Sequence, residues 1–310
     1  MAFLELSKAL YEEKGSEMIH RLFPEYEARI AVGLSGRGSQ CYGFDDELSA
    51  DHDYDPGFCL WLTDEDEARI GLSLRRAYRD MLPDGRSERS AMGGSGMGVQ
   101  RIGDFFLPYT GTRGAPEELL QWLSLPSHAL AEACNGPVWR DELGEFSRIR
   151  EKIAGGMPED VRIKKLAGAI LIMAQSGQYN YPRCLKRGEE GAAMLAMAEF
   201  VKAACSVVFL LNRRHAPYYK WTLRAMAELE RLGSLRDALE FLLTGENDAA
   251  GQRLKAQLVE DVCANVVSEL RSQRLSCGSW DYLEPHALDM NEHIQNAQLR
   301  SLHIIAGWHG

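Results

Sequence analysis

Residues 29–62 read RIAVGLSGRGSQCYGFDDELSADHDYDPGFCLWL, and this stretch decides the fold of the first part of the chain. It contains two apolar runs, residues 30–34 and 58–62, each of a length typical of a buried β-strand. A segment rich in glycine and serine follows the first run and allows the backbone to approach a ligand closely. Backbone N–H groups near Gly38 and the hydroxyl of Ser39 could bind a phosphate there.

Two aspartates precede the second apolar run. Asp51 and Asp53 are two residues apart, and on an extended chain such residues share a face, so both carboxylates could reach one point. Two carboxylates together with a triphosphate are a usual way for proteins to hold Mg²⁺. Asp53 and Asp55 form an equally spaced pair, but Asp55 precedes Pro56, where a turn is expected. The sequence therefore favours Asp51 and Asp53 as the metal-binding pair.

The order of strand, Gly-Ser, spacer, Asp-x-Asp and strand resembles the nucleotidyltransferase superfamily of the DNA polymerase beta type. The run GFDDELSADHDYDPGF is similar to an uncharacterised bacterial branch of it, as are the later phrases GQYNYPRCLKRGE and LNRRHAPYYKW. The resemblance also guides the choice of Asp51 and Asp53. It implies an α+β fold in which an N-terminal nucleotidyltransferase-type mixed sheet with flanking helices is followed by an all-helical C-terminal domain.

The distribution of secondary-structure signals suggests where such domains would meet. Helix and strand signals alternate to about residue 110, and helical patterns dominate beyond it. The segment YTGTRGAP, residues 109–116, has the composition of a linker. We predict a nucleotidyltransferase-like α/β domain at residues 1–112 and a helical domain at residues 113–310. The phrase at residues 135–141 is expected to be a turn that leads into a helix.

A two-metal transfer normally uses a third carboxylate from a neighbouring strand. The predicted third strand, residues 99–106, contains Asp104 as its only acid, and this residue could instead cap the helix or turn that begins at Phe105. Where relatives carry an acid inside this strand, the chain has Gln100 and Arg101. Asp104 is the predicted third catalytic residue, and the sequence leaves the number of metal ions open.

Basic residues of the helical half could contact the phosphates of a nucleotide. Arg183 and Arg187 lie in GQYNYPRCLKRGE, where they could bind phosphate oxygens or form a solvated helix face. Lys220 follows two tyrosines in the second phrase. The resemblance implies a basic residue of the helical domain over the nucleotide, and Lys220 is assigned that role.

Composition restricts the class of protein. With 310 residues, 45% of them hydrophobic, the chain can form one large core or two moderate ones. A net charge of −10 argues against non-specific binding to nucleic acid or a membrane surface. The seven cysteines form no Cys-x-x-Cys pair, no secretory signal is evident and the apolar stretch 203–211 is too short to span a bilayer. These features predict a cytoplasmic protein with no membrane partner, and the scattered histidines predict no structural metal.

Together these patterns predict an enzyme, a Mg²⁺-dependent nucleotidyltransferase that moves a nucleoside monophosphate, most readily AMP from ATP, onto an unidentified acceptor. The acceptor would be a hydroxyl-type group on a small molecule or a protein. In this hypothesis Asp51 and Asp53 hold Mg²⁺, while Gly38 and Ser39 position the triphosphate. One alternative is a catalytically weak or inactive nucleotide-binding module of regulatory or antitoxin-like type. Another is a phosphotransferase or phosphodiesterase of a different fold.

Overall fold

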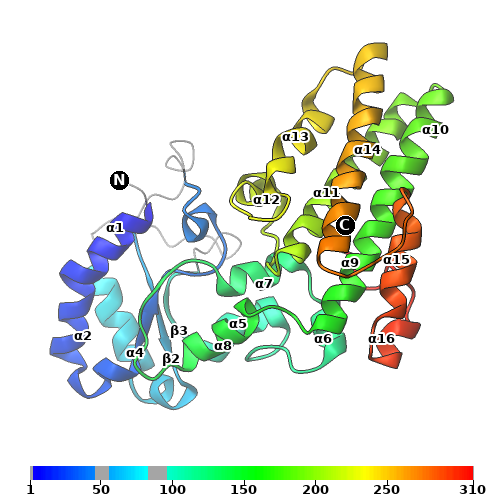
Figure 1. The fold of residues 1–310 in the computed structure, drawn as a ribbon. Coiled ribbons are helices and arrows are strands. Elements are labelled where there is room, and N and C mark those ends of the chain that lie inside the picture. The colour runs from blue at the N-terminus through cyan, green and yellow to red at the C-terminus, as the bar shows by residue number, and fades with distance from the viewer. Residues whose placement is uncertain (1–2, 46–55, 83–95, 310) are drawn as a thin grey trace. The chain divides into compact units, whose positions relative to one another are not determined.

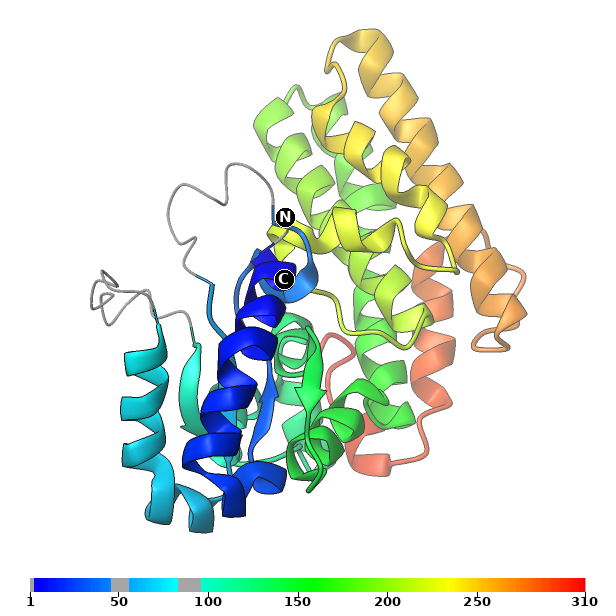
Figure 2. The same cartoon turned by 90° about the vertical axis from the view of Figure 1, so that its left-hand side faces the viewer.

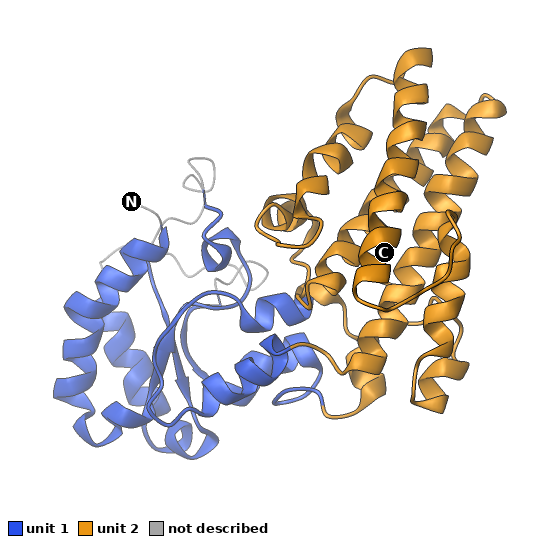
Figure 3. Ribbon diagram, in the orientation of Figure 1, with its two compact units in different colours: residues 1–116, 129–155 blue, residues 117–128, 156–310 orange. Residues whose placement is uncertain are grey.

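The computed structural model describes residues 3–45, 56–82 and 96–309, and the chain divides into two compact units (Figure 3). Unit 1 consists of Met1–Pro116 and Ala129–Gly155, and unit 2 consists of Glu117–His128 and Gly156–Gly310. The segment 129–155 thus belongs with the first part of the chain. The predicted division into domains at residues 1–112 and 113–310 remains a prediction.

Unit 1 is built on a four-stranded mixed sheet with the strand order β3-β2-β1-β4. The strands are β1 (Ala31–Gly33), β2 (Cys59–Leu62), β3 (Gly98–Arg101) and β4 (Val138–Arg140). β1 runs antiparallel to β2 and to β4, whereas β2 and β3 are parallel. A mixed sheet combined with many helices agrees with the predicted α+β class.

The central strand β2 is buried on both faces, which explains its continuous apolar sequence. Phe58, Leu60 and Leu62 pack with side chains from α1 (Phe3–Leu10), α2 (Ser16–Leu22) and α4 (Asp64–Met81), which lie on one side of the sheet (Figures 1 and 2). Trp61 points to the other face, because neighbouring residues of a strand alternate. There it stacks on Phe146 of α8 (Glu145–Ala154), with ring centroids 3.8 Å apart.

The third strand is shorter than the sequence predicted. β3 ends at Arg101, and α5 (Ile102–Thr110) begins at the next residue, so the predicted strand at residues 99–106 was wrong in its second half. The reason is visible in the buried positions, since Ile102, Phe105, Phe106 and Tyr109 have the three- and four-residue spacing of a helix. The helix ends at Gly111, whose positive φ of 70° forms a left-handed cap.

Another strand lies where a turn leading into a helix was expected. Val138–Arg140 forms β4 and pairs with β1, about a hundred residues earlier in the chain. α7 (Ser127–Cys134) precedes this strand and α8 follows it. The all-helical expectation for residues 113–310 therefore fails at this strand, because three extended residues are stabilised by a distant partner strand.

Unit 2 is helical throughout the part of it that the structure describes. Its α-helices are α6 (Leu119–Ser124), α9 (Glu159–Met173), α10 (Tyr181–Lys186), α11 (Glu190–Leu211), α12 (Tyr219–Met226), α13 (Arg236–Thr244), α14 (Ala249–Ser272), α15 (Leu283–Glu292) and α16 (Ala297–Ser301). A π-helical segment, Ala174–Asn180, connects α9 to α10. α9 packs against both α11 and α15 and forms much of the core.

Helix α11 is long and apolar enough, by length and composition, to cross a membrane. It passes that test alone among the helices of the described residues, and 61% of its most apolar window is buried inside the structure. Burial of this kind is typical of a core helix. Residues 203–211, the apolar stretch noted in the sequence, form its second half.

Candidate functional site

The glycine-rich segment leaves the sheet at the edge where β2 begins. Gly33, the last residue of β1, pairs with Cys59, the first residue of β2, and Cys59 pairs in turn with Gly98 of β3. The chain that follows β1 and the chain that precedes β2 therefore meet at one edge of the sheet. In the sequence, the Gly38 loop follows the first of these strands and the two aspartates precede the second.

A single asparagine holds the loop that follows β1. The backbone N–H of Gly36 donates to Asn135 Oδ1 at 2.8 Å, and Asn135 Nδ2 donates to the carbonyl of Gly36 at 2.7 Å. The hydroxyl of Ser35 donates to the same Oδ1 at 3.3 Å. Asn135 therefore replaces the backbone partners that a loop residue lacks. Sequence reasoning treated this asparagine as part of a turn and missed its role.

The two residues after Asn135 also contact the loop, and we call Asn135, Gly136 and Pro137 together the clamp. Pro137 accepts a hydrogen bond from the N–H of Leu34 at 2.9 Å. Gly136 lies so close that a Cβ atom added to it would be 2.1 Å from the carbonyl oxygen of Leu34. Only glycine permits this approach.

The predicted phosphate-binding residues lie at the end of the clamped loop. Gly38 adopts a positive φ of 113° and caps a short 3-10 turn, Ser39–Tyr42. Gly38 is exposed and Ser39 is half-buried, so this part of the backbone borders solvent. Asp51 and Asp53 lie outside the described residues, as does Asp55.

A carboxylate that the sequence did not single out lies beside the loop. Glu132 of α7 is 3.6 Å from Nε of Arg37, which follows Gly36 in the chain. Burial raises the pKa of the Glu132 carboxyl, and the positive charge of Arg37 lowers it in part. No regular spacing links Glu132 to the loop in sequence, so only the fold reveals this neighbour.

Asp104, the predicted third catalytic residue, lies away from the Gly38 loop. β2 and β3 are parallel and Leu62 pairs with Arg101, so the chain after Arg101 leaves the sheet at the edge opposite Gly38. In the first turn of α5, Asp104 forms an ion pair with Arg113, which also pairs with Asp64 at 2.6 Å. The structure does not bring Asp104 together with the loop.

The three predicted cations are exposed residues of unit 2. Arg183 lies on α10 with its guanidinium 4.7 Å from the ring centroid of Tyr179, and Arg187 caps the end of the same helix. Lys220 lies on α12. Arg187 precedes the 22-residue helix α11 and Lys220 follows it, and a helix of that length extends for about 33 Å. Figure 1 accordingly shows α10 and α12 well apart, so the structure does not assemble these cations around one phosphate group.

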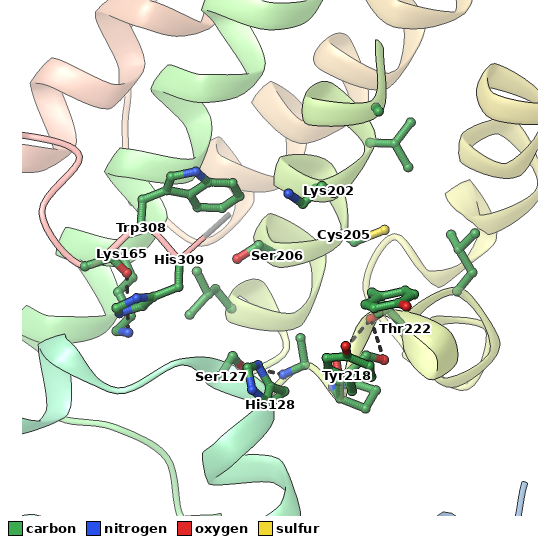
Figure 4. A pocket seen from close by; sticks show the side chains of 18 of the residues that line it. Ser127, His128, Lys165, Lys202, Cys205, Ser206, Tyr218, Thr222, Trp308 and His309 are labelled. Carbon is green, nitrogen blue, oxygen red and sulfur yellow. Dashed lines mark hydrogen bonds between the residues drawn. The ribbon is translucent and has the colours of Figure 1, made fainter. Parts of the chain in front are cut away.

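Unit 2 contains a cavity of about 510 Å³ that sequence reasoning did not anticipate (Figure 4). Its walls come from segments far apart in the chain. They include α11, the start of α12, the start of α7 and the residues Gly307–His309. Tyr218 and Tyr219 border the cavity, so the phrase LNRRHAPYYKW was the one sequence signal that pointed to it.

One end of this cavity carries positive charge. Lys165 of α9 is 5% exposed, and its Nζ donates to the carbonyls of Leu125 at 2.7 Å and Gly307 at 3.5 Å. Burial lowers the pKa of the Lys165 ammonium to about 8. His309 donates from Nε2 to the carbonyl of Leu123, and its pKa is lowered by burial and then by the charge of Lys165.

In residues 3–45, 56–82 and 96–309, no group of three or more His, Cys, Asp or Glu side chains is arranged to hold a metal ion. Asp51 and Asp53 lie outside these ranges.

Comparison with known proteins identifies one partial match. Residues 122–222 match the model of a family described as a domain of unknown function, DUF4037. No curated protein matches the chain. The matched third of the sequence includes Asn135, Lys165 and Lys220 but not the Gly38 loop or the aspartates that precede β2. Placement in the nucleotidyltransferase superfamily therefore stays a prediction.

Proposed function

We propose that the chain is a Mg²⁺-dependent nucleotidyltransferase that moves AMP from ATP onto a hydroxyl-type acceptor. One observation carries the proposal, the pairing of Gly33 with Cys59. This pairing brings the loop that contains Gly38 and the chain that enters β2 to the same edge of the sheet. A nucleotide site of the expected kind needs this arrangement, because phosphate donors and metal-binding carboxylates must act on one triphosphate.

The donor chemistry at this edge suits Mg²⁺. Asp51 and Asp53 supply hard carboxylate oxygens, which Mg²⁺ prefers, and they precede the strand that starts there. When bound, the ion would neutralise charge on the phosphates of ATP. Positioning would be the task of the chain itself, through backbone N–H groups near Gly38 and the hydroxyl of Ser39.

Asn135 and Glu132 extend the proposal beyond the sequence motif. Asn135 holds both backbone groups of Gly36 and so keeps the loop in one conformation before a substrate arrives. Glu132, whose pKa burial raises, could accept the proton of the acceptor hydroxyl. This role replaces the one first assigned to Asp104, which lies toward the other edge of the sheet.

A nucleotide-binding module without transfer activity is the second candidate. The described strand β3 contains Gly98, Val99, Gln100 and Arg101, so it offers no acid of the kind that a third-strand carboxylate would supply. Arg101 instead pairs with Glu67 of α4 at 2.7 Å. These contacts favour a purely structural role for β3, as expected in a nucleotide-binding module that has lost transfer activity.

Calorimetric titration with a non-hydrolysable ATP analogue, with and without Mg²⁺, tests the shared nucleotide site. We expect Mg²⁺-dependent binding by the wild type, its loss in the Asp51→Asn, Asp53→Asn double variant and its retention in Asp104→Asn, the matched control. Folded wild type that does not bind the analogue, or binding that the double variant retains, would contradict the proposal.

Transfer of label from α-labelled ATP, with release of pyrophosphate, separates the two candidates. The enzyme should transfer label to a cellular acceptor, and Glu132→Gln should lower this turnover without weakening analogue binding. Analogue binding without any transfer across protein and small-molecule fractions would favour the inactive module.

A further inference from the structure

We propose that the cavity of unit 2 is a binding site for a small organic carboxylate with an apolar body. The proposal does not rest on nucleotidyl transfer, because all the lining residues belong to unit 2. At about 510 Å³, the cavity is within the usual size range of small-molecule sites, roughly 300–1,000 Å³. Two features of its lining specify the chemistry of the ligand.

The first feature is an apolar wall. Val201, Cys205 and Leu210 of α11, Leu223 of α12 and Pro217, which precedes α12, all line the cavity. Burial raises the pKa of the Cys205 thiol to about 12, so this cysteine acts as a neutral, apolar group. A wall of this kind binds hydrocarbon or an aromatic ring by excluding water.

The second feature is Lys165, a buried ammonium beside His309 that forms no ion pair with a carboxylate of the described residues. Figure 4 shows Lys165 beside His309 at one end of the cavity, and the charges that act on His309 are those of Lys165 and His128, all of one sign. Within the described residues, Lys165 has carbonyl partners and no ion pair with a carboxylate. A buried ammonium without a counter-ion is costly unless an anion approaches it.

Comparison with two neighbouring lysines shows how unusual the environment of Lys165 is. Lys202, also at the cavity, lies 3.5 Å from Glu199 and is 51% exposed at its side chain, so its charge has both a partner and solvent. Lys164 precedes Lys165 in the chain but does not line the cavity, and its Nζ donates to Asn291 Oδ1 at 2.8 Å and the Leu302 carbonyl at 2.7 Å. Lys165 combines burial and access to the cavity with the absence of an acidic partner among the residues that the structure describes.

The charge indicates a carboxylate as the head group. Lys165 supplies one ammonium charge, and two of its three hydrogens already point to carbonyls. A single remaining donor with an adjacent histidine suits one carboxylate. A doubly charged phosphate usually needs several charge-assisted hydrogen bonds, often from arginine, and none of the described residues that line the cavity is an arginine.

The indole of Trp308 provides a direct readout. Trp308 lines the cavity, and its Nε1 donates to Glu199 Oε1 at 3.3 Å. A ligand that fills the space beside this ring should change its fluorescence. Binding can thus be followed in the full chain.

The experiment compares acids with their neutral amides, so that the charge is the only variable. Hexanoate, 3-phenylpropionate and 1-naphthaleneacetate, each with its amide, are titrated into the wild-type chain while calorimetric heat and tryptophan fluorescence, to which Trp308 contributes as one of six tryptophans, are recorded. We expect at least one acid to bind at least about tenfold more tightly than its amide at neutral pH. Equal affinities for acid and amide in every pair, or no binding of any acid, would overturn the proposal.

Matched variants then assign the effect to Lys165. Lys165→Met should lower the affinity for the acid to that of the amide, while Lys186→Met, at an exposed lysine of α10 that does not line the cavity, should change it by less than about twofold. The Asp51→Asn, Asp53→Asn variant should bind the acid as the wild type does, which separates this proposal from the nucleotide site. If Lys165→Met does not fold, the comparison of acid with amide in the wild type still decides the question. An acid preference that Lys165→Met retains would overturn the assignment.

Discussion

The loop that follows β1 and the cavity of unit 2 differ in how their buried polar groups are paired. In the loop, both backbone groups of Gly36 are bonded to Asn135, and the neighbouring Ser35 hydroxyl has the same partner. In the cavity, the described partners of Lys165 are two carbonyls and no acid. Polar groups that are fully hydrogen-bonded stabilise a fold, whereas a buried charge without a counter-ion beside a cavity is available to bind a ligand of opposite charge. Mutations should therefore cost stability in the loop and little in the cavity.

The largest expected effect tests the close approach behind the loop. Gly136→Ala would bring a Cβ to 2.1 Å from the Leu34 carbonyl oxygen at a φ of 63°. We expect it to lower the free energy of unfolding by about 4 kcal/mol or more, since backbone on both sides must move. Urea denaturation followed by circular dichroism measures the change.

Gly43→Ala is the matched control. Gly43 has a nearly identical φ of 67°, but nothing lies within 4 Å of its added Cβ. This substitution should cost only about 1–2 kcal/mol, which is the left-handed conformation alone. If the two variants lose equal stability, the approach of Gly136 to Leu34 is not important for the fold.

An intermediate effect is expected at the clamp itself. Asn135→Ala leaves the N–H and carbonyl of Gly36 without their partner, and should cost about 1–3 kcal/mol. Ser35→Ala removes only a long bond of 3.3 Å and leaves Asn135 Oδ1 with a donor, so it should cost less than Asn135→Ala. Thermal unfolding of the two variants checks the order, and a greater loss in Ser35→Ala would refute the role given to Asn135.

The sequence predicts those elements of the fold whose apolar pattern or helix cap lies within the element itself. The apolar runs at residues 30–34 and 58–62 contain β1 and β2, and an acidic first turn that begins at Asp64 opens α4. Thr63 caps that helix by accepting a hydrogen bond from the N–H of Asp66. Each of these elements carries its cause within a few residues.

Elements that depend on distant partners were not predictable in this way. β4 has three residues and owes its conformation to β1. Asn135 meets Gly36 although 99 residues separate them. β3 and α5 follow each other without an intervening turn, and strand and helix periods are hard to tell apart where apolar runs are short.

The cavity was the least predictable part for the same reason. Ser127, Lys165, Tyr219 and His309 meet only after the helices of unit 2 have packed. Lysine at position 165 looks in sequence like any basic residue of an amphipathic helix, and only its burial shows that it is exceptional.

The smallest expected effect on stability comes from Lys165. Its pKa in the folded chain is about 8, below the ordinary value of 10.5, because burial disfavours the charged form. Between these two pH values the unfolded chain binds more protons, so the wild type should gain stability as pH rises from about 8 to 10.5. Lys165→Met removes this dependence along with the buried charge, but leaves the Leu125 and Gly307 carbonyls without their donor. Because the two consequences oppose each other, the free energy of unfolding at neutral pH should change by only about 1 kcal/mol.

Denaturation of wild type and Lys165→Met across this pH range measures the difference, and taking the difference removes the contributions of titrating groups that do not interact with Lys165. A bound carboxylate sharpens the comparison. It would stabilise the ammonium form of Lys165, and so weaken the rise in stability of the wild type with pH while leaving Lys165→Met unaffected. If Lys165→Met instead lost as much stability as Asn135→Ala, the buried lysine would be a structural group like the clamp, and the contrast between the two regions would disappear.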